Sequence, residues 1–229
     1  MPMPRAPRII VPGIPHHVTQ RGNHQTKLFY SPLFFHEYLE ILKKQCDRTG
    51  LVIDGYCLMD NHIHLIATPP TEQSLSSAIG QAHHLYSQAR NLHKKLNGHI
   101  WEKRFFSCPL DEAHFVNALV YVDMNPVKAG IVRKPRDWMW SSAVAHAGGK
   151  DIVGLIDPVR WGRLASKIGW SELPGVIRAR SIEDDERLEF FTRTGRPMGD
   201  DKFLDKIEKI LGYSVRRREK AGRPATNEG

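Results

Sequence analysis

The sequence predicts an α+β fold with a ferredoxin-like β-α-β-β-α-β core, and three observations lead to it. Four short segments carry apolar residues in the alternating or continuous patterns of strands. Two longer segments between them, residues 31–50 and 74–96, have apolar residues at helical spacing. Their order along the chain is that of a split βαβ unit, which forms a four-stranded antiparallel sheet with helices on one face.

The first half of this core begins with a strand at residues 14–23, where the segment IPHHVTQRGN alternates and ends in Gly-Asn. The helix of residues 31–50 follows. Ser31 is expected to cap it, Pro32 fits its first turn, and Gly50 ends it.

The second half begins with a hairpin of two strands, residues 51–59 and 62–68, closed by a tight turn at Asp60-Asn61. The helix of residues 74–96 comes next, and a fourth strand is expected over residues 98–110.

A third helix is expected over residues 111–127, with Asp111 as its cap and Pro126 near its end. Ser74 is the expected cap of the preceding helix. This third helix is additional to the β-α-β-β-α-β core.

The composition changes near residue 150, which predicts two parts. Residues 1–150 form the catalytic domain in this interpretation, and residues 151–229 form a helical, basic extension that binds DNA or regulates the site. The last ten or so residues are polar and basic, and we expect them to be disordered.

The chain has a formal net charge of +8 and three scattered cysteines. A basic surface attracts polyanions, and nucleic acid is the usual partner. An odd number of cysteines without a paired motif suits a reducing compartment better than a disulfide framework. No segment has the length of a membrane span or the apolar core of a signal peptide. We therefore expect a cytoplasmic, nucleoid-associated protein without a membrane partner.

The segment MDNHIHLIA, residues 59–67, contains two histidines where a strand is predicted. The period of two places His62 and His64 on the same face of that strand. One interpretation is a metal site, since neutral imidazoles are common metal ligands, although a third ligand must then come from elsewhere in the chain. The other is a polar sheet face with a structural role.

The third helix contains a possible partner for these histidines. Tyr121 and Asn125 are four residues apart, so they lie on one face of the helix. Asn125 offers an amide oxygen and Tyr121 a phenol that can act as a nucleophile. Spacing alone favours a packed tyrosine and a helix-capping asparagine. It also allows Tyr86, with His83 and Arg90 one turn to either side, as a rival nucleophile.

Several segments in the correct order make a more specific pattern. DNHIHLIATP resembles the His-hydrophobe-His motif of single-strand DNA nucleases, and HHVTQRGN, GHIWEKRFFS, LVYVDMNPVKAGIV and TGRPMGDDKFLDKIEKILG are similar to further signatures of one branch. The resemblance is to the IS200-like Y1 transposases, specifically the REP-associated tyrosine transposases, and it extends from Pro7 to about Gly212. Asp60 stands where many relatives carry proline.

This resemblance implies roles for four residues. His62 and His64 would be metal ligands, Tyr121 the nucleophile, and Asn125 the third ligand, where more distant relatives carry glutamine. The cofactor would be Mg²⁺, with Mn²⁺ as an alternative because imidazoles tolerate it better. Tyr121 would cut single-stranded DNA through a 5′-phosphotyrosine intermediate.

The implied partner is single-stranded DNA with hairpins from repetitive extragenic palindromes (REP). Arg21, Lys103 and Arg104 are candidate phosphate contacts near strand ends. The protein would be a monomer or a homodimer.

Two other functions stay open. One is a domesticated REP-hairpin binder with little or no cleavage, and the other is a hydrolytic metalloenzyme that needs no tyrosine.

Overall fold

We analysed a computed structural model of the chain, which describes residues 8–95, 97–170 and 182–216, without the side chain of residue 182. The polar tail expected to be disordered lies largely outside this part of the chain. Within the described ranges, no helix is both long enough and apolar enough to cross a membrane.

The centre of the molecule is a four-stranded sheet in which every neighbouring pair is antiparallel. Its strands are β1 (His16–Arg21), β2 (Val52–Met59), β3 (His62–Thr68) and β4 (Phe106–Pro109), in the order β2-β3-β1-β4. This order, with β1 and β3 at the centre, is the predicted β-α-β-β-α-β topology. The predicted α+β fold with its antiparallel sheet is therefore confirmed.

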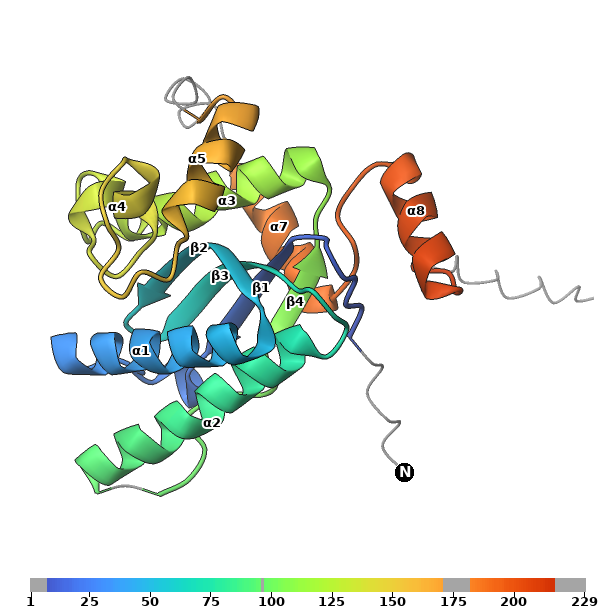
Figure 1. The fold of residues 1–229 in the computed structure, drawn as a ribbon. Helices are drawn as coiled ribbons and strands as arrows, with labels where there is room; N and C mark the ends of the chain where they lie inside the picture. The colour runs from blue at the N-terminus through green and yellow to red at the C-terminus, as the bar shows by residue number, and fades with distance from the viewer. Residues whose placement is uncertain (1–7, 96, 171–181, 217–229) are drawn as a thin grey trace, which may run out of the picture.

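Helices cover both faces of this sheet (Figure 1). Helices α1 (Pro32–Thr49) and α2 (Ser74–Lys94) lie side by side on one face, and α3 (Glu112–Lys128) and α7 (Ile182–Thr194) lie on the other. The two helices of the predicted core thus lie on one face, as expected, and the additional helix α3 and a helix of the C-terminal extension cover the other. The reason is visible in β2 and β3, whose residues are buried at nearly every position. A sheet with two apolar faces must be covered on both.

Shorter elements complete the chain. They are the 3₁₀ turns η1 (Asn23–Gln25) and η2 (Pro135–Asp137) and the helices α4 (Ala143–His146), α5 (Pro158–Lys167) and α8 (Asp201–Leu211). Helix α8 stands at the side of the molecule (Figure 1) and packs through Phe203 and Ile207 on Val11 and Val215 in a small apolar cluster of its own.

The predicted helix boundaries are mostly confirmed. Asp111 caps α3 by accepting a hydrogen bond of 2.8 Å from the backbone N–H of His114. Gly50 ends α1 in the left-handed conformation that glycine adopts at low cost, with φ of 68°. Ser31 is the N-cap residue of α1, although its side chain makes no capping hydrogen bond.

Two predicted boundaries are wrong. Ser74 is already inside α2, and its hydroxyl donates to the carbonyl of Thr71 instead of capping the helix. The fourth strand is expected over residues 98–110 but runs only over Phe106–Pro109. Upstream of it, a single bridge joins Trp101 to Gly22, and the charged residues that follow Trp101 are exposed to solvent. The backbone still contacts the end of β1 here, since the N–H of Glu102 donates to the carbonyl of Arg21 over 3.0 Å, but the regular ladder begins only at Phe106.

The three cysteines are all free and buried, as expected of a protein without a disulfide framework. The core between the sheet and helices α1 and α2 is strongly aromatic. Tyr38 and Tyr86 are fully buried there and pack edge to face, with their ring centroids 5.3 Å apart. This core holds one face of the sheet rigid and leaves the other to α3 and α7.

Candidate active site on the sheet face under α3

The two histidines of β3 lie together on the face of the sheet that α3 covers. His64 is buried and His62 is half-buried, with ring centroids 5.0 Å apart. In the sheet register His64 lies opposite Thr19 of β1 and Cys57 of β2, so it occupies the centre of the sheet. The prediction that both imidazoles share one face is therefore confirmed.

Helix α3 brings Tyr121 over these histidines. The Tyr121 ring lies edge-on to His64, with centroids 5.3 Å apart and planes at 81°. Asn125 follows one helical turn later, and its Nδ2 donates to the carbonyl of Tyr121 over 3.1 Å. Tyr121 of α3 and the histidines of β3 are thus far apart in the sequence but meet in one cluster.

A neighbouring asparagine orients His62. Nδ1 of His62 lies 2.7 Å from Oδ1 of Asn61. The amide of Asn61 also donates from Nδ2 to the carbonyl of Gln25 over 3.4 Å, which leaves Oδ1 as the end that faces the ring. An amide oxygen can only accept, so Nδ1 of His62 carries the hydrogen and Nε2 carries the lone pair. Asp60, the other residue of this turn, instead forms an exposed ion pair with Lys27 over 2.8 Å.

His64 is engaged in the same way by a third histidine. Nδ1 of His64 lies 3.0 Å from Nε2 of His17 on β1, and Nδ1 of His17 lies 2.6 Å from the hydroxyl of Thr192 on α7. Both rings are buried. Of the two adjacent histidines of β1, His17 is the one that contacts this cluster.

The electrostatics favour neutral imidazoles. Burial lowers the pKa of His62 to about 4, assisted by the charge of Arg21. Burial also lowers the pKa of His64 well below its usual value, and the neighbouring His62 and His17 add to this effect. At neutral pH the lone pairs are therefore available for a metal ion, which imidazolium groups would repel.

The phenol of Tyr121 is in a different environment. Its hydroxyl donates a hydrogen bond of 2.8 Å to Oε1 of Glu189 on α7. Burial raises the pKa of Tyr121 above its usual range, the charge of Glu189 adds to the rise, and a hydrogen bond from Asn125 acts in the opposite direction. Lys128, which forms an ion pair with Asp185, lies over the Tyr121 ring with Nζ 5.0 Å from the centroid.

A cavity of about 250 Å³ opens beside His64. Glu189 lines it from α7, and three cationic side chains line it as well: Arg21, Lys103 and Arg193. Two of the three predicted phosphate contacts, Arg21 and Lys103, thus border the histidine cluster. The third, Arg104, borders a neighbouring cavity of about 390 Å³ together with Arg8, Arg193 and Arg196.

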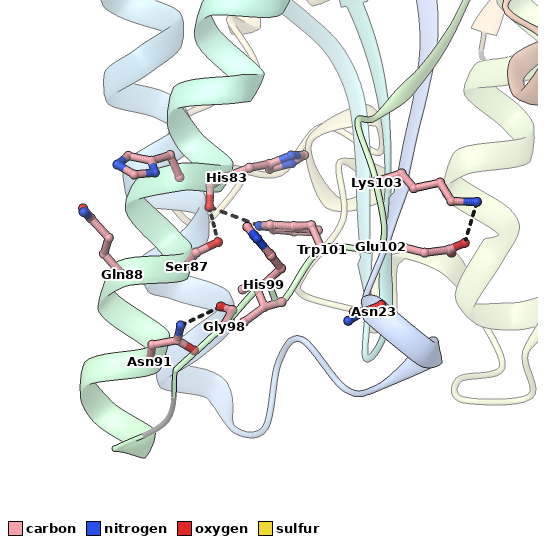
Figure 2. A pocket seen from close by; sticks show the side chains of 12 residues that line it. Asn23, His83, Ser87, Gln88, Asn91, Gly98, His99, Trp101, Glu102 and Lys103 are labelled. Carbon is pink, nitrogen blue, oxygen red and sulfur yellow. Dashed lines mark hydrogen bonds and ion pairs between the residues drawn. The ribbon is translucent and has the colours of Figure 1, made fainter. Parts of the chain in front are cut away.

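A wider hollow of about 680 Å³ lies between α2 and the segment 98–103 (Figure 2). Its wall is formed in part by Trp101, whose Nε1 donates to the carbonyl of His83 over 3.1 Å. Asn91 closes the lower end by donating to the carbonyl of Gly98 over 3.0 Å. Glu102 and Lys103 line both this hollow and the cavity of His64, so the two open on either side of the same segment.

Tyr86, the rival nucleophile, does not reach this site. It is fully buried in the core under α1 and α2, and its hydroxyl donates to the carbonyl of Leu28 over 2.8 Å. His83, one turn before Tyr86, does not reach the site either. It is buried, and its ring stacks on Trp101 with centroids 4.0 Å apart.

The sequence prediction missed four residues that contact the cluster: His17, Asn61, Glu189 and Thr192. The period-2 pattern carried a signal for His17, and the adjacency to His62 carried one for Asn61. Glu189 lies 68 positions from Tyr121, and Thr192 lies 175 positions from His17. No local pattern connects positions so far apart.

The donor set fits a divalent cation. His62 and His64 each bind a neighbour through Nδ1, and neither Nε2 makes a hydrogen bond within the described part of the chain. Metal-binding histidines usually have their second nitrogen held in this way. No group of three histidine, cysteine, aspartate or glutamate side chains among the described residues could hold a metal. A third ligand would be the amide oxygen of Asn125, with further positions for water or substrate.

Three comparisons, two of sequence and one of structure, relate this chain to known proteins. A family model described as "Transposase IS200 like" matches residues 11–125, which is half of the chain. A Haemophilus influenzae protein described as "Putative REP-associated tyrosine transposase" is 28% identical over 141 residues, which are 56% of this chain and 77% of that protein.

Among solved structures, the fold is similar to that of a REP-associated tyrosine transposase bound to a REP hairpin. The TM-score is 0.55 with 20% sequence identity, over 64% of this chain and 86% of that one. The likeness concerns the fold, and the match to the family model concerns the sequence. The chain belongs to the IS200-like transposase family of tyrosine (Y1) enzymes.

Proposed function

We propose that this protein is a metal-dependent endonuclease and strand transferase that cuts single-stranded DNA by forming a covalent 5′-phosphotyrosine at Tyr121. The observation that carries the proposal is the position of the Tyr121 ring, edge-on to His64 and 5.3 Å from it, at the edge of a neutral histidine pair. The family membership supports the same chemistry.

His62, His64 and Asn125 are the residues that we propose hold the divalent ion, Mg²⁺ or Mn²⁺. When bound, such an ion would bind a nonbridging phosphate oxygen and stabilise the negative charge of the transition state. The chain contributes two imidazoles that lie on one face of the sheet and bind their neighbours through Nδ1, and burial favours their neutral forms. Asn125 adds an oxygen without adding charge, which leaves the site attractive to a phosphodiester.

Tyr121 supplies the nucleophile and Glu189 the proton acceptor. As the Tyr121 oxygen bonds to phosphorus, its O–H bond breaks and the proton passes to the Glu189 carboxylate, 2.8 Å away. The bond from phosphorus to the 3′ oxygen breaks, and that oxygen takes up a proton from solvent and leaves as a 3′-OH. The DNA stays joined to the protein through its 5′ phosphate. Attack by a 3′-OH on this link reverses the step and rejoins a strand.

The DNA that we propose as substrate is a single strand that carries REP-type hairpins, as in the complex of the structurally similar transposase. Arg21 and Lys103 line the cavity of His64 and would bind the phosphates next to the scissile bond. Arg104 would contact the strand further along, beside the neighbouring cavity. Such a protein would work at the nucleoid.

A gel assay tests this proposal. Labelled single strands with the hairpin repeats that flank the protein's own gene are incubated with protein and Mg²⁺ or Mn²⁺, and then separated under denaturing conditions. We expect a metal-dependent, protease-sensitive adduct that is absent with Tyr121→Phe and His62→Ala. Tyr213→Phe, at an exposed tyrosine, serves as the matched control and should form the adduct normally.

Two results would contradict the proposal. Cleavage that survives Tyr121→Phe would point to a metal-activated water, and so to a hydrolytic enzyme. Binding of the hairpin strand without any adduct, at every metal concentration, would identify a hairpin-binding protein without strand-transfer activity.

A further inference from the structure

A chain of three side chains runs from helix α7 to the metal-facing histidine. Thr192 on α7 contacts His17 on β1, and His17 contacts His64 on β3. Thr192 and His17 are fully buried, and His64 is nearly so, with 4% of its surface exposed. Buried polar atoms are nearly always hydrogen-bonded, so the directions of these hydrogen bonds decide where each ring carries its hydrogen.

The direction of the first hydrogen bond follows from the backbone of α7. The Thr192 hydroxyl donates to the carbonyl of Leu188 over 2.7 Å, one helical turn earlier. A hydroxyl has a single hydrogen, and the carbonyl can only accept it. Towards His17 Nδ1, 2.6 Å away, the Thr192 oxygen is therefore an acceptor. Nδ1 of His17 must carry a hydrogen.

The second direction follows from the first. A neutral imidazole with a hydrogen on Nδ1 has its lone pair on Nε2. Nε2 of His17 is thus the acceptor in its contact of 3.0 Å with Nδ1 of His64. The two rings are nearly parallel, at 9°, with centroids 5.3 Å apart, so they lie edge to edge and in line for an N–H···N hydrogen bond. Nδ1 of His64 must carry the hydrogen, and its lone pair is on Nε2.

We propose that Thr192 and His17 are positioning residues that fix the tautomer of His64, so that its Nε2 lone pair always faces the active site. The proposal rests on the proposed function in one respect, which is that His64 binds the metal. It assigns a purpose to helix α7, which lies outside residues 11–125 matched by the family model. It also explains why a polar hydroxyl is buried at the interface between α7 and the sheet.

The first test reads the tautomers of the metal-free protein directly. In ¹⁵N-histidine-labelled protein, long-range ¹H–¹⁵N correlation spectra distinguish rings with Nδ1–H from rings with Nε2–H. We expect both His17 and His64 to have Nδ1–H. A wild-type spectrum in which His64 has Nε2–H would overturn the proposal, and this measurement requires no variant.

The second test removes the acceptor. In Thr192→Val, Nδ1 of His17 loses its partner, so we expect His17 to move its hydrogen to Nε2 and His64 to change to Nε2–H. Thr192→Ser keeps the hydroxyl and should keep both tautomers. Thr194→Val is a matched control, since the Thr194 hydroxyl bonds the carbonyl of Phe191 on the same helix but lies at the exposed end.

The third test measures the affinity of the protein for Mn²⁺ in the absence of DNA. Electron paramagnetic resonance of the free ion monitors the binding. We expect Thr192→Val to weaken Mn²⁺ binding by about tenfold or more, as loss of an orienting partner usually does. Thr192→Ser and Thr194→Val should bind as the wild type does. A changed tautomer with unchanged Mn²⁺ affinity would confirm the role of Thr192 but exclude His64 as a metal ligand. An unchanged tautomer in Thr192→Val would overturn the inference.

Discussion

The hydroxyl of Tyr121 on α3 donates a hydrogen bond to the carboxylate of Glu189 on α7, over 2.8 Å. Tyr121 is 4% exposed, whereas Glu189 lies at the open edge of the site. Burial and the charge of Glu189 both raise the pKa of Tyr121, so the phenol needs an acceptor for its proton at the moment of attack. Glu189 is within the reach expected of a general base, and its exposure lets it exchange that proton with solvent.

Replacing Glu189 should therefore slow the chemical step. We expect Glu189→Gln to lower the rate of adduct formation by about 100-fold or more, because an amide cannot take up the proton. Single-turnover kinetics with labelled hairpin DNA measure this rate, and a filter-binding assay should show unchanged DNA affinity. Glu186→Gln, at an exposed position of the same helix, should react at the wild-type rate. A faster reaction in Glu189→Gln would mean that the carboxylate restrains Tyr121 instead of activating it.

Asn61 should affect the metal through His62. Its Oδ1 accepts the hydrogen on Nδ1 of His62, so Asn61→Leu leaves that ring without its orienting partner. We expect Mn²⁺ affinity to fall by about 10- to 100-fold, measured by isothermal titration calorimetry. Asn61→Asp keeps an acceptor at this position and should bind at least as tightly as the wild type. Equal affinities of the leucine and aspartate variants would exclude the orienting role.

The sequence predicted the parts of the site that depend on local periodicity. The period of two placed His62 and His64 on one strand face, and the period of 3.6 placed Tyr121 and Asn125 on one helix face. Which tyrosine meets the histidines was not decided by spacing, because Tyr86 has an equally suitable pattern. The difference is that α2 and α3 cover opposite faces of the sheet, which is a property of the tertiary fold (Figure 1).

The contacts of α7 illustrate what local patterns cannot reveal. Glu189 and Thr192 are polar residues of a helix with an ordinary charged sequence, and only packing against the sheet brings them to Tyr121 and His17.

The error in the predicted bounds of the fourth strand has a similar origin. Trp101 continues a strand-like pattern, but its ring packs on His83 of α2, and the regular ladder begins only at Phe106.

Two cationic residues should set the salt dependence of DNA binding. Arg21 and Lys103 line the cavity of His64, so each variant, Arg21→Gln or Lys103→Gln, should lose about one phosphate contact. The slope of log affinity against log salt concentration should then decrease by about 0.7 for each loss. Fluorescence anisotropy over a range of salt concentrations measures it. Lys44→Gln, exposed on α1, should leave the slope unchanged, and a similar change in all three variants would contradict this assignment.

Stability should fall on acidification because of His83. Burial lowers its pKa to about 3 in the folded protein, below the usual value of 6.5. The unfolded chain therefore takes up the proton first, so stability decreases as the pH falls below about 6.5 and continues to decrease until about pH 3. Between pH 7 and pH 5 this single group should cost about 2 kcal/mol.

Urea denaturation at a series of pH values measures this effect. His83→Gln should reduce the slope of unfolding free energy against pH, whatever its effect on stability at pH 7. His84→Gln, at the adjacent exposed position, should keep the wild-type slope. Identical slopes in all three proteins would show that His83 does not titrate with unfolding.

The most direct test of the central claim is to locate the covalent bond. The protein–DNA adduct formed with Mg²⁺ or Mn²⁺ is trimmed with nuclease and digested with trypsin, and tandem mass spectrometry then identifies the modified residue. We predict one nucleotide-bearing peptide, with the nucleotide joined through its 5′ phosphate to the oxygen of Tyr121. A modification on any other residue, or a linkage through a 3′ phosphate, would contradict the mechanism.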